Sequence, residues 1–391
     1  MNQLEAAEIR PYFQPIISVQ TQQIFGYESL GRQIVNGRAA SLGPFFTSGS
    51  VSERDQIAAD RMIREKAISH LSGVPSPPYL FLNIKPNWIY NCYILTGELL
   101  TLQMLKKHNI DGKRIVIEVT ESEFKGDLEH LNAIIENYRT AGCMIAIDDV
   151  GAGFSGLDRV ALIRPNILKI DLNILRKSRT HEGYLALLRS FSNICDQIGA
   201  SLLVEGVETT DDVQLALSVG ANYLQGYLFS KALPQFLPEH HFALQVREEL
   251  ERFRNIQNEE MDYFFRYRTI EPELVDIGSR FNGEYADDML ERIIQDLRPA
   301  CMRMYVCNEA GDQISSNYEA DEAGHWKKVP QPLNTNWSWR PYFNMNIYML
   351  KHNNQQFFLS YAYKDINRSV SVRTVSYRIG NGNYLFMDIR L

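Results

Sequence analysis

The sequence predicts an α/β protein: a TIM-like (β/α)8 barrel with an antiparallel first strand, then long connecting helices and a small α+β domain. Three observations support this. Short apolar runs alternate with longer amphipathic segments between residues 11 and about 233, the rhythm of parallel strands and covering helices. Helix-forming residues dominate from about residue 237 to about residue 298, and strand-like runs follow. We therefore divide the chain at 1–236, 237–298 and 299–391.

Eight segments of the first region have the composition of buried strands. They begin near residues 11, 24, 80, 114, 144, 167, 202 and 223. The first two lie so close together that we expect an antiparallel hairpin, whereas the others are separated by stretches long enough for helices. Such a barrel gathers the carboxyl ends of its strands at one mouth, where these folds place their chemistry.

The predicted third region carries strand-like runs joined by turns. A hairpin is expected over residues 302–318, and further antiparallel strands over 357–365, 369–379 and 383–391. The preceding segment 237–298 has apolar residues at helical spacing and is interpreted as long helices rather than as a flexible linker.

Polar side chains recur at the predicted strand ends of the barrel. Most of them are carboxylates. The full set is Glu28, Asn83, Glu118, Glu121, Asp148, Asp149, Lys169, Asp171, Glu205, Glu208 and Gln225. Carboxylates that share a cavity repel one another unless cations lie among them. Oxygen ligands without His or Cys suit hard ions such as Mg²⁺ or Mn²⁺. The adjacent Asp148 and Asp149 favour two ions, the arrangement that hydrolyses phosphodiesters.

Each of these residues also has an ordinary explanation. A single Asp or Glu at a strand end more often caps a helix or forms a surface ion pair than binds a metal. The recurrence of the same residue type on successive strand ends favours the metal site.

Composition limits the partners. The formal net charge of −7 argues against a DNA- or RNA-coating protein, which needs clustered Lys and Arg. No stretch reaches the roughly 18 apolar residues that cross a bilayer. The five cysteines are scattered and have no zinc-site spacing. We expect a cytoplasmic protein with reduced thiols and no membrane span.

Seven segments resemble, in order, the motifs of the EAL family of cyclic-di-GMP phosphodiesterases. The naming motif reads Glu28-Ser29-Leu30, and the others are LNIKP from residue 82, IEVTESE from 117, AIDDVGAGFSGL from 146, LKID from 168, VEGVET from 204 and LQGYLF from 224. Ordered motifs are far more specific than a single one. The resemblance covers about residues 10–235. It implies hydrolysis of cyclic-di-GMP to linear pGpG with two Mg²⁺ or Mn²⁺ ions, in a homodimer.

The resemblance also implies a role for each matching residue. Metal ligands are implied at Glu28, Asn83, Glu118, Asp148 and Asp149. Lys169 and Glu205 resemble the pair that orients and activates the attacking water, roles that an ammonium and a carboxylate can fill. Substrate contacts are implied at Arg32, Gln14, Leu30 and Gln225, and supporting positions at Glu121, Asp171, Glu208, Gly151 and Gly153. Arg32 has an alternative role in an ion pair at the barrel rim.

Departures from the family pattern leave a second hypothesis open. The loop written DDFGTG in the family has Val150 and Ala152 in place of the aromatic residue and the threonine. This loop couples metal binding to dimerisation in the family, so the rate and its regulation are in question. Ser29 replaces the Ala of the naming motif, with little effect expected. The alternative to an enzyme is a catalytically silent receptor for cyclic-di-GMP. A purely structural module ranks last, because it would not explain why costly carboxylates cluster in the barrel.

The segment NWSWRPYF at residues 336–343 resembles a Cache/PAS-like sensor domain that follows some EAL domains. Trp337, Trp339, Arg340 and Tyr342 could line a pocket for a ligand carboxylate. Packing of an aromatic core beside a surface arginine explains them equally well. We expect this region to receive an unknown small-molecule or protein signal and to bias the helices and the dimer.

Overall fold

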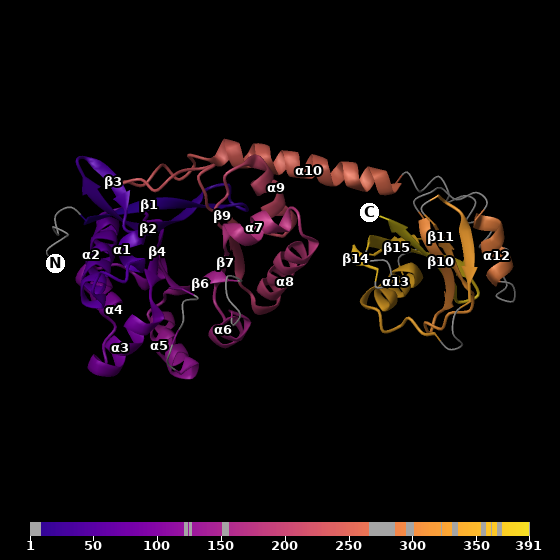
Figure 1. Cartoon of the computed structure of the whole chain (residues 1–391), viewed down its shortest axis with the longest axis horizontal. Helices are drawn as coiled ribbons and strands as arrows, with labels where there is room; N and C mark the ends of the chain where they lie inside the picture. The colour runs from indigo at the N-terminus through magenta and orange to yellow at the C-terminus, as the bar shows by residue number, and fades with distance from the viewer. Residues whose placement is uncertain are drawn as a thin grey trace. The chain divides into compact units, whose positions relative to one another are not determined.

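The computed structural model describes residues 9–120, 124, 127–150, 156–265, 286–294, 301–321, 323–330, 335–352, 357–360, 362–365 and 370–390. The chain forms two compact units, residues 1–257 and 258–391 (Figure 1). Each has its own sheet and its own buried core. We therefore describe the two units separately.

Eight strands close into a barrel in the first unit (Figure 1). They are β1 (Ile9–Ser18), β2 (Ile24–Val35), β4 (Tyr79–Ile84), β5 (Ile115–Thr120), β6 (Met144–Val150), β7 (Ile167–Ile170), β8 (Ser201–Val204) and β9 (Tyr223–Leu224). From β2 to β9 these strands pair in parallel. β1 pairs antiparallel with both β2 and β9 and closes the barrel. The predicted barrel with an antiparallel first strand is confirmed. The short β3 (Arg38–Ser41) extends β2 into a hairpin.

Helices follow the strands along the chain. They are α1 (Gly43–Thr47), α2 (Glu53–Leu71), α3 (Pro86–Thr96), α4 (Leu100–Lys107), α5 (Leu128–Thr140), α6 (Gly156–Ile163), α7 (Leu172–Ser178), α8 (Glu182–Ile198), α9 (Thr210–Ser218) and α10 (Ala243–Phe265). α5 buries apolar residues at helical spacing, from Leu131 to Tyr138. α10 begins on the barrel, where Val246 joins the core. None of the described helices is long and apolar enough to cross a membrane.

An apolar layer fills the bottom of the barrel. Each of six strands contributes one buried side chain to a single cluster: Ile16, Phe81, Val116, Ala146, Ile167 and Leu203. Because strand side chains alternate between faces, the residue two positions further on also points into the barrel. On the parallel strands of this set those residues are polar: Asn83, Glu118, Asp148, Lys169 and Glu205. The fold thus places a polar layer directly on an apolar one.

The second unit is an antiparallel sheet with a helix on each face. Its elements are α12 (Ala286–Ile293), β10 (Cys301–Asn308), β11 (Asn317–Ala320), β12 (Trp326–Val329), α13 (Pro341–His352), β13 (Phe357–Leu359), β14 (Tyr363–Lys364), β15 (Ser371–Gly380) and β16 (Asn383–Arg390). The sheet order is β12-β11-β10-β16-β15-β13, and β14 also pairs with β15. Met304 and Val306 pack with α12, whereas Tyr305 and Cys307 pack with α13, as alternation along β10 requires.

The expected hairpin forms between β10 and β11, but the expectation of one strand over residues 357–365 is wrong. Two short strands, β13 and β14, both pair with β15. The register shifts by one residue between the Leu359↔Val375 and Tyr363↔Val372 pairs. The chain between β13 and β14 has one residue more than the facing part of β15, and this extra residue interrupts the ladder. The five cysteines of the chain are free thiols.

Phe343 on α13 provides a test of the packing in the second unit. It is 0 % exposed and its ring stacks 5.2 Å from that of Phe386. We expect Phe343→Ala to lower the free energy of unfolding of this unit by about 3–5 kcal/mol, because it leaves a cavity in the core. Urea unfolding followed by tryptophan fluorescence measures this loss, since three of the four tryptophans lie in the unit.

The matched control is Tyr348→Ala on the same helix. Tyr348 is 61 % exposed, so its removal should change the free energy of unfolding by no more than about 0.5 kcal/mol. Equal losses from the two variants would contradict the packing of α13 described above.

Candidate functional site

The Lys169 ammonium lies at the centre of the polar layer, among four carboxylates. Its Nζ atom lies 2.5 Å from Glu205 Oε1, 2.6 Å from Glu118 Oε1, 3.2 Å from Asp148 Oδ1 and 3.7 Å from Glu28 Oε2. Lys169 is 1 % exposed and Glu118 is 0 % exposed. Charges removed from water in this way are stable only when they face opposite charges at short distance.

Two amides hold the Glu28 carboxylate in place. Asn83 Nδ2 donates to Glu28 Oε1 at 2.7 Å, and Gln225 Nε2 donates to Glu28 Oε2 at 2.7 Å. Asn83 and Gln225 come from β4 and the chain after β9, which lie on either side of the β1–β2 hairpin in the barrel. Glu28 is therefore fixed from both sides and directed toward Lys169.

Burial shifts the proton affinities of this cluster. It raises the pKa of Glu118 well above its usual range, and the negative charges of Glu28 and Asp148 raise it further, against the opposing effect of Lys169. For Glu205, burial together with the same neighbouring charges raises the pKa to about 8. Burial alone would lower the pKa of Lys169, but the surrounding carboxylates outweigh it and hold that pKa well above its usual value.

The cluster has the chemistry of a hard-cation site. Four carboxylates face one ammonium, and Glu118 Oε2 is buried without a hydrogen-bond partner. Oxygen-only donors with excess negative charge suit divalent ions. In the described part of the chain, no three Asp, Glu, His or Cys side chains already have the arrangement of a metal centre; the Lys169 ammonium lies between the carboxylates. The residues fit divalent cations in charge and in donor type.

A cavity of about 250 Å³ opens beside the cluster. Leu30, Arg32 and Asn83, three of the predicted site residues, line it. Arg32 donates from Nη1 to the Gly31 carbonyl oxygen at 3.0 Å and contributes its positive charge to the cavity. The predicted substrate contacts on β2 therefore lie next to the predicted metal ligands.

Three other predicted site residues make separate contacts. Gln14 is buried, and its amide donates to the backbone carbonyl of Ser230 at 3.3 Å. Asp171 caps the first turn of α7, the ordinary role of an Asp before a helix. Glu208 forms an ion pair with Arg176. The structure gives Asp171 and Glu208 local contacts rather than a place in the Lys169 cluster.

The remaining predicted residues fall outside the description. Glu121, Gly151 and Gly153 lie outside the described residues, as does the side chain of Asp149. Val150, one of the two departures from the family loop, is buried at the end of β6, and the other, Ala152, lies outside the described residues. The Val150 side chain thus packs into the barrel unit.

Sequence reasoning missed several cavity residues. Phe46, Asp60, Lys85 and Trp88 line the same cavity. Phe46, Asp60 and Trp88 lie on α1, α2 and α3, whereas Lys85 lies between β4 and α3. Only Lys85 carried a signal, because it follows β4 directly, within the LNIKP motif. The others approach the site through helix packing, which strand patterns do not report.

In the second unit, the aromatic residues singled out in the sequence gather around Arg340. Its guanidinium carbon lies 4.5 Å from the ring centre of Trp339 and 5.7 Å from that of Trp337. The Tyr363 ring is 6.0 Å away and stacks on Tyr342. Trp339 is mostly exposed, whereas Trp337 packs against the α13 face of the sheet. The cluster thus combines core packing with an exposed cation–aromatic surface.

Comparison with protein families identifies the class of protein that this fold and this site define. A model of the EAL domain matches residues 1–232, and a model of the EAL-domain associated signalling protein domain matches residues 236–391. The chain belongs to the EAL family.

A particular relative resembles the whole chain. YkuI, an uncharacterized EAL-domain containing protein of Bacillus subtilis (strain 168), is 32% identical over 390 residues, which cover 98% of this chain and 94% of YkuI. The crystal structure of YkuI, in complex with the substrate c-di-GMP and calcium, matches with a TM-score of 0.88 at 31% identity and covers 99% of this chain and 97% of that chain. The likeness extends through both units.

Two other relatives match a shorter part of the chain. Klebsiella pneumoniae BlrP1, in a manganese and cyclic-di-GMP complex, has a TM-score of 0.51 at 25% identity, covering 58% of this chain and 56% of that chain. The probable cyclic di-GMP phosphodiesterase PdeI of Escherichia coli (strain K12) is 27% identical over 238 residues, which cover 59% of this chain and 30% of PdeI.

The central ammonium can be tested by substitution. We expect Lys169→Met, in the presence of a chelator, to lower the free energy of unfolding by about 3–5 kcal/mol, because the buried carboxylates lose their opposite charge. Urea unfolding at neutral pH measures this difference.

Lys107→Met provides the matched control. Lys107 is exposed and pairs with Glu65 at the surface, so its loss should cost less than about 1 kcal/mol. A loss from Lys169→Met no larger than that from the control would show that the ammonium does not stabilise the carboxylate cluster.

Proposed function

We propose that this chain is a cytoplasmic phosphodiesterase that hydrolyses cyclic-di-GMP to linear pGpG and so lowers the level of this second messenger. The observation that carries the proposal is the buried layer of carboxylates around Lys169, with a cavity beside it lined by Arg32. Membership of the EAL family and the nucleotide bound in the YkuI crystal structure support the choice of substrate.

We further propose that two Mg²⁺ or Mn²⁺ ions bind at this layer. Glu28, Asn83, Glu118, Asp148 and Asp149 would hold them. When bound, divalent ions supply positive charge that offsets the charge developing on the phosphodiester in the transition state. The unpartnered Glu118 Oε2 and the excess of carboxylates over cations favour such occupancy. The calcium and manganese present in the YkuI and BlrP1 complexes support it.

In the proposed reaction, the chain binds the phosphate and manages one proton. The Arg32 guanidinium contacts the phosphate, for which its forked donors are well shaped. The Lys169 ammonium orients a water molecule, and the Glu205 carboxylate accepts its proton. The water oxygen forms the new bond to phosphorus as the bond to the 3′ oxygen breaks. The 3′ oxygen takes up a proton from solvent, and Glu205 later releases the proton that it accepted to solvent. The product is the linear dinucleotide pGpG.

Lys169 and Glu205 are well disposed for these roles because they already contact each other. Their charged atoms lie 2.5 Å apart, and the Glu205 side chain is the more exposed of the two. Burial, together with the charges of Asp148 and Glu28, raises the pKa of Glu205 to about 8. The deprotonated form therefore holds a proton more tightly than a surface glutamate does, and it becomes more populated as the pH rises.

Hydrolysis of cyclic-di-GMP by the purified chain with Mg²⁺ or Mn²⁺, followed by chromatography for pGpG, tests the proposal. We expect product from the wild type, a loss of at least about 100-fold in kcat/KM for Glu28→Ala, and no product in excess chelator. Glu251→Ala, on the exposed part of α10, is the control and should retain the wild-type rate.

Tight binding of cyclic-di-GMP without any product would contradict hydrolysis and place the chain in the receptor class. If the chain neither bound nor hydrolysed cyclic-di-GMP, the assignment of this nucleotide would be overturned as well. Equal rates for the wild type and Glu28→Ala would exclude the proposed metal site.

We propose in addition that the second unit is a Cache/PAS-like sensor and that the chain works as a homodimer. The sheet with a helix on each face, and the Arg340 surface with its aromatic neighbours, support a domain that binds a small-molecule or protein signal. A ligand can change the barrel's activity only through its different affinity for two states of the chain.

Removal of residues 299–391 tests the sensor proposal. The first unit has its own closed barrel and its own core, so it should remain folded. We expect the shortened chain to differ from the full chain at least about threefold in hydrolysis rate, in its oligomeric state measured by light scattering, or in both. If the shortened chain kept both the hydrolysis rate and the oligomeric state of the full chain, a regulatory role for the second unit would be contradicted.

A further inference from the structure

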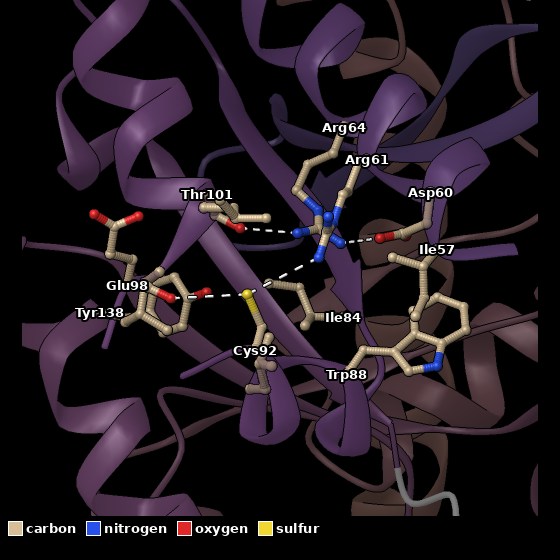
Figure 2. Close-up of a pocket in the computed structure, with 13 residues that line it drawn as sticks. Ile57, Asp60, Arg61, Arg64, Ile84, Trp88, Cys92, Glu98, Thr101 and Tyr138 are labelled. Carbon is tan, nitrogen blue, oxygen red and sulfur yellow. Dashed lines mark hydrogen bonds and ion pairs between the residues drawn. The ribbon is translucent and has the colours of Figure 1, made fainter. Parts of the chain in front are cut away.

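The first unit contains a second, smaller cavity that the proposed phosphodiester chemistry does not use. Most of its lining residues come from α2, α3 and α4 (Figure 2). The cavity holds about 30 Å³, and a volume of about 10–15 Å³ is enough for one water molecule. The cavity therefore suits a small molecule of about two heavy atoms.

A thiol lines this cavity, that of Cys92 on α3. Cys92 is partly exposed, and Arg61 and Glu98 beside it are exposed, so solvent reaches this side of the cavity. Arg61 Nη2 lies 3.9 Å from Cys92 Sγ, as the dashed line in Figure 2 marks. A partly exposed thiol next to a cationic group is the usual setting of a reactive cysteine.

A second guanidinium, that of Arg64, lines the same cavity. Its Nη1 atom donates to Thr101 Oγ1 at 2.9 Å, and its Nη2 atom contacts the Asp60 carboxylate. Arg64 is only 7 % exposed, and its buried Nε atom has no hydrogen-bond partner among the described residues. Buried donors are seldom left unpaired. This Nε atom therefore favours a small molecule with oxygen acceptors in the cavity.

The other four cysteines of the chain are all buried: Cys143, Cys195, Cys301 and Cys307. Burial raises the pKa of the first two to about 12, and it raises the pKa of the last two well above the usual range. The thiolate is the reacting form of cysteine, so these four thiols are poorly reactive at neutral pH. Cys92 is the accessible thiol of the five.

We propose that Cys92 is an oxidation site and that hydrogen peroxide, a molecule of two heavy atoms, binds in the cavity beside it. Arg61 and Arg64 donate hydrogen bonds to the peroxide oxygens. The Cys92 thiolate attacks one oxygen, the O–O bond breaks, and the other oxygen leaves as hydroxide, which takes up the proton lost by the thiol and becomes water. Sulfur is oxidised by two electrons to a sulfenic acid, and the peroxide is reduced. The inference is independent of the proposed hydrolysis of cyclic-di-GMP.

Trapping of the sulfenic acid with dimedone tests the proposal. The full chain is treated with hydrogen peroxide, and peptide mass spectrometry gives the oxidation rate at each cysteine. A parallel reaction with iodoacetamide gives an alkylation rate, which depends on exposure and thiolate but not on peroxide binding. The ratio of oxidation to alkylation at Cys92 should be at least about tenfold higher in the native chain than in urea, which destroys the cavity and its charged hydrogen-bond donors. Equal ratios would overturn the proposal.

Arg61→Met removes one of the proposed donors. Arg61 is exposed, so the variant should fold, and we expect the ratio at Cys92 to fall at least about fivefold. Arg54→Met is the matched control, because it removes the same charge from the same helix outside the cavity lining, and it should leave the ratio unchanged. An unchanged ratio in Arg61→Met, equal losses from both variants, or oxidation of the buried cysteines as fast as that of Cys92 would contradict the assignment.

Discussion

The ion pairs of Lys169 are the interaction on which the first unit depends most. Four carboxylates converge on the inside of a closed barrel, and one of them, Glu118, is completely buried. Without a cation these groups would repel one another or would have to bind protons. The Lys169 ammonium lies between them, so the barrel can close around a polar layer that is costly to bury. The same excess of negative charge makes the layer suitable for divalent ions.

The apolar layer beneath explains how the barrel tolerates this arrangement. Residues such as Phe81 and Leu203 fill the interior from below, and the polar residues follow them at the next inward position of each strand. The polar groups are therefore held at the carboxyl ends of the strands, next to the cavity lined by Arg32. Apolar burial in the lower layer also stabilises the barrel, and the chemical groups lie in the upper layer.

Much of this architecture could be predicted from the sequence, because the alternation along strands and the order of the motifs are both visible as local patterns. Glu28, Asn83 and Glu118 were expected to meet, and they do. Asp171 and Glu208 instead have local partners, which sequence spacing alone does not reveal. Asp60 and Trp88 reach the cavity from helices whose packing no strand pattern reports. The division of residues 357–365 into β13 and β14 depends on a register shift that becomes visible only when β15 is in place.

A crystal structure of the full chain with Mn²⁺ and cyclic-di-GMP, using the anomalous scattering of manganese, would test the account most directly. The account predicts manganese peaks among Glu28, Glu118 and Asp148, and a phosphate near Arg32. Manganese peaks elsewhere, or a nucleotide bound away from the polar layer, would contradict it.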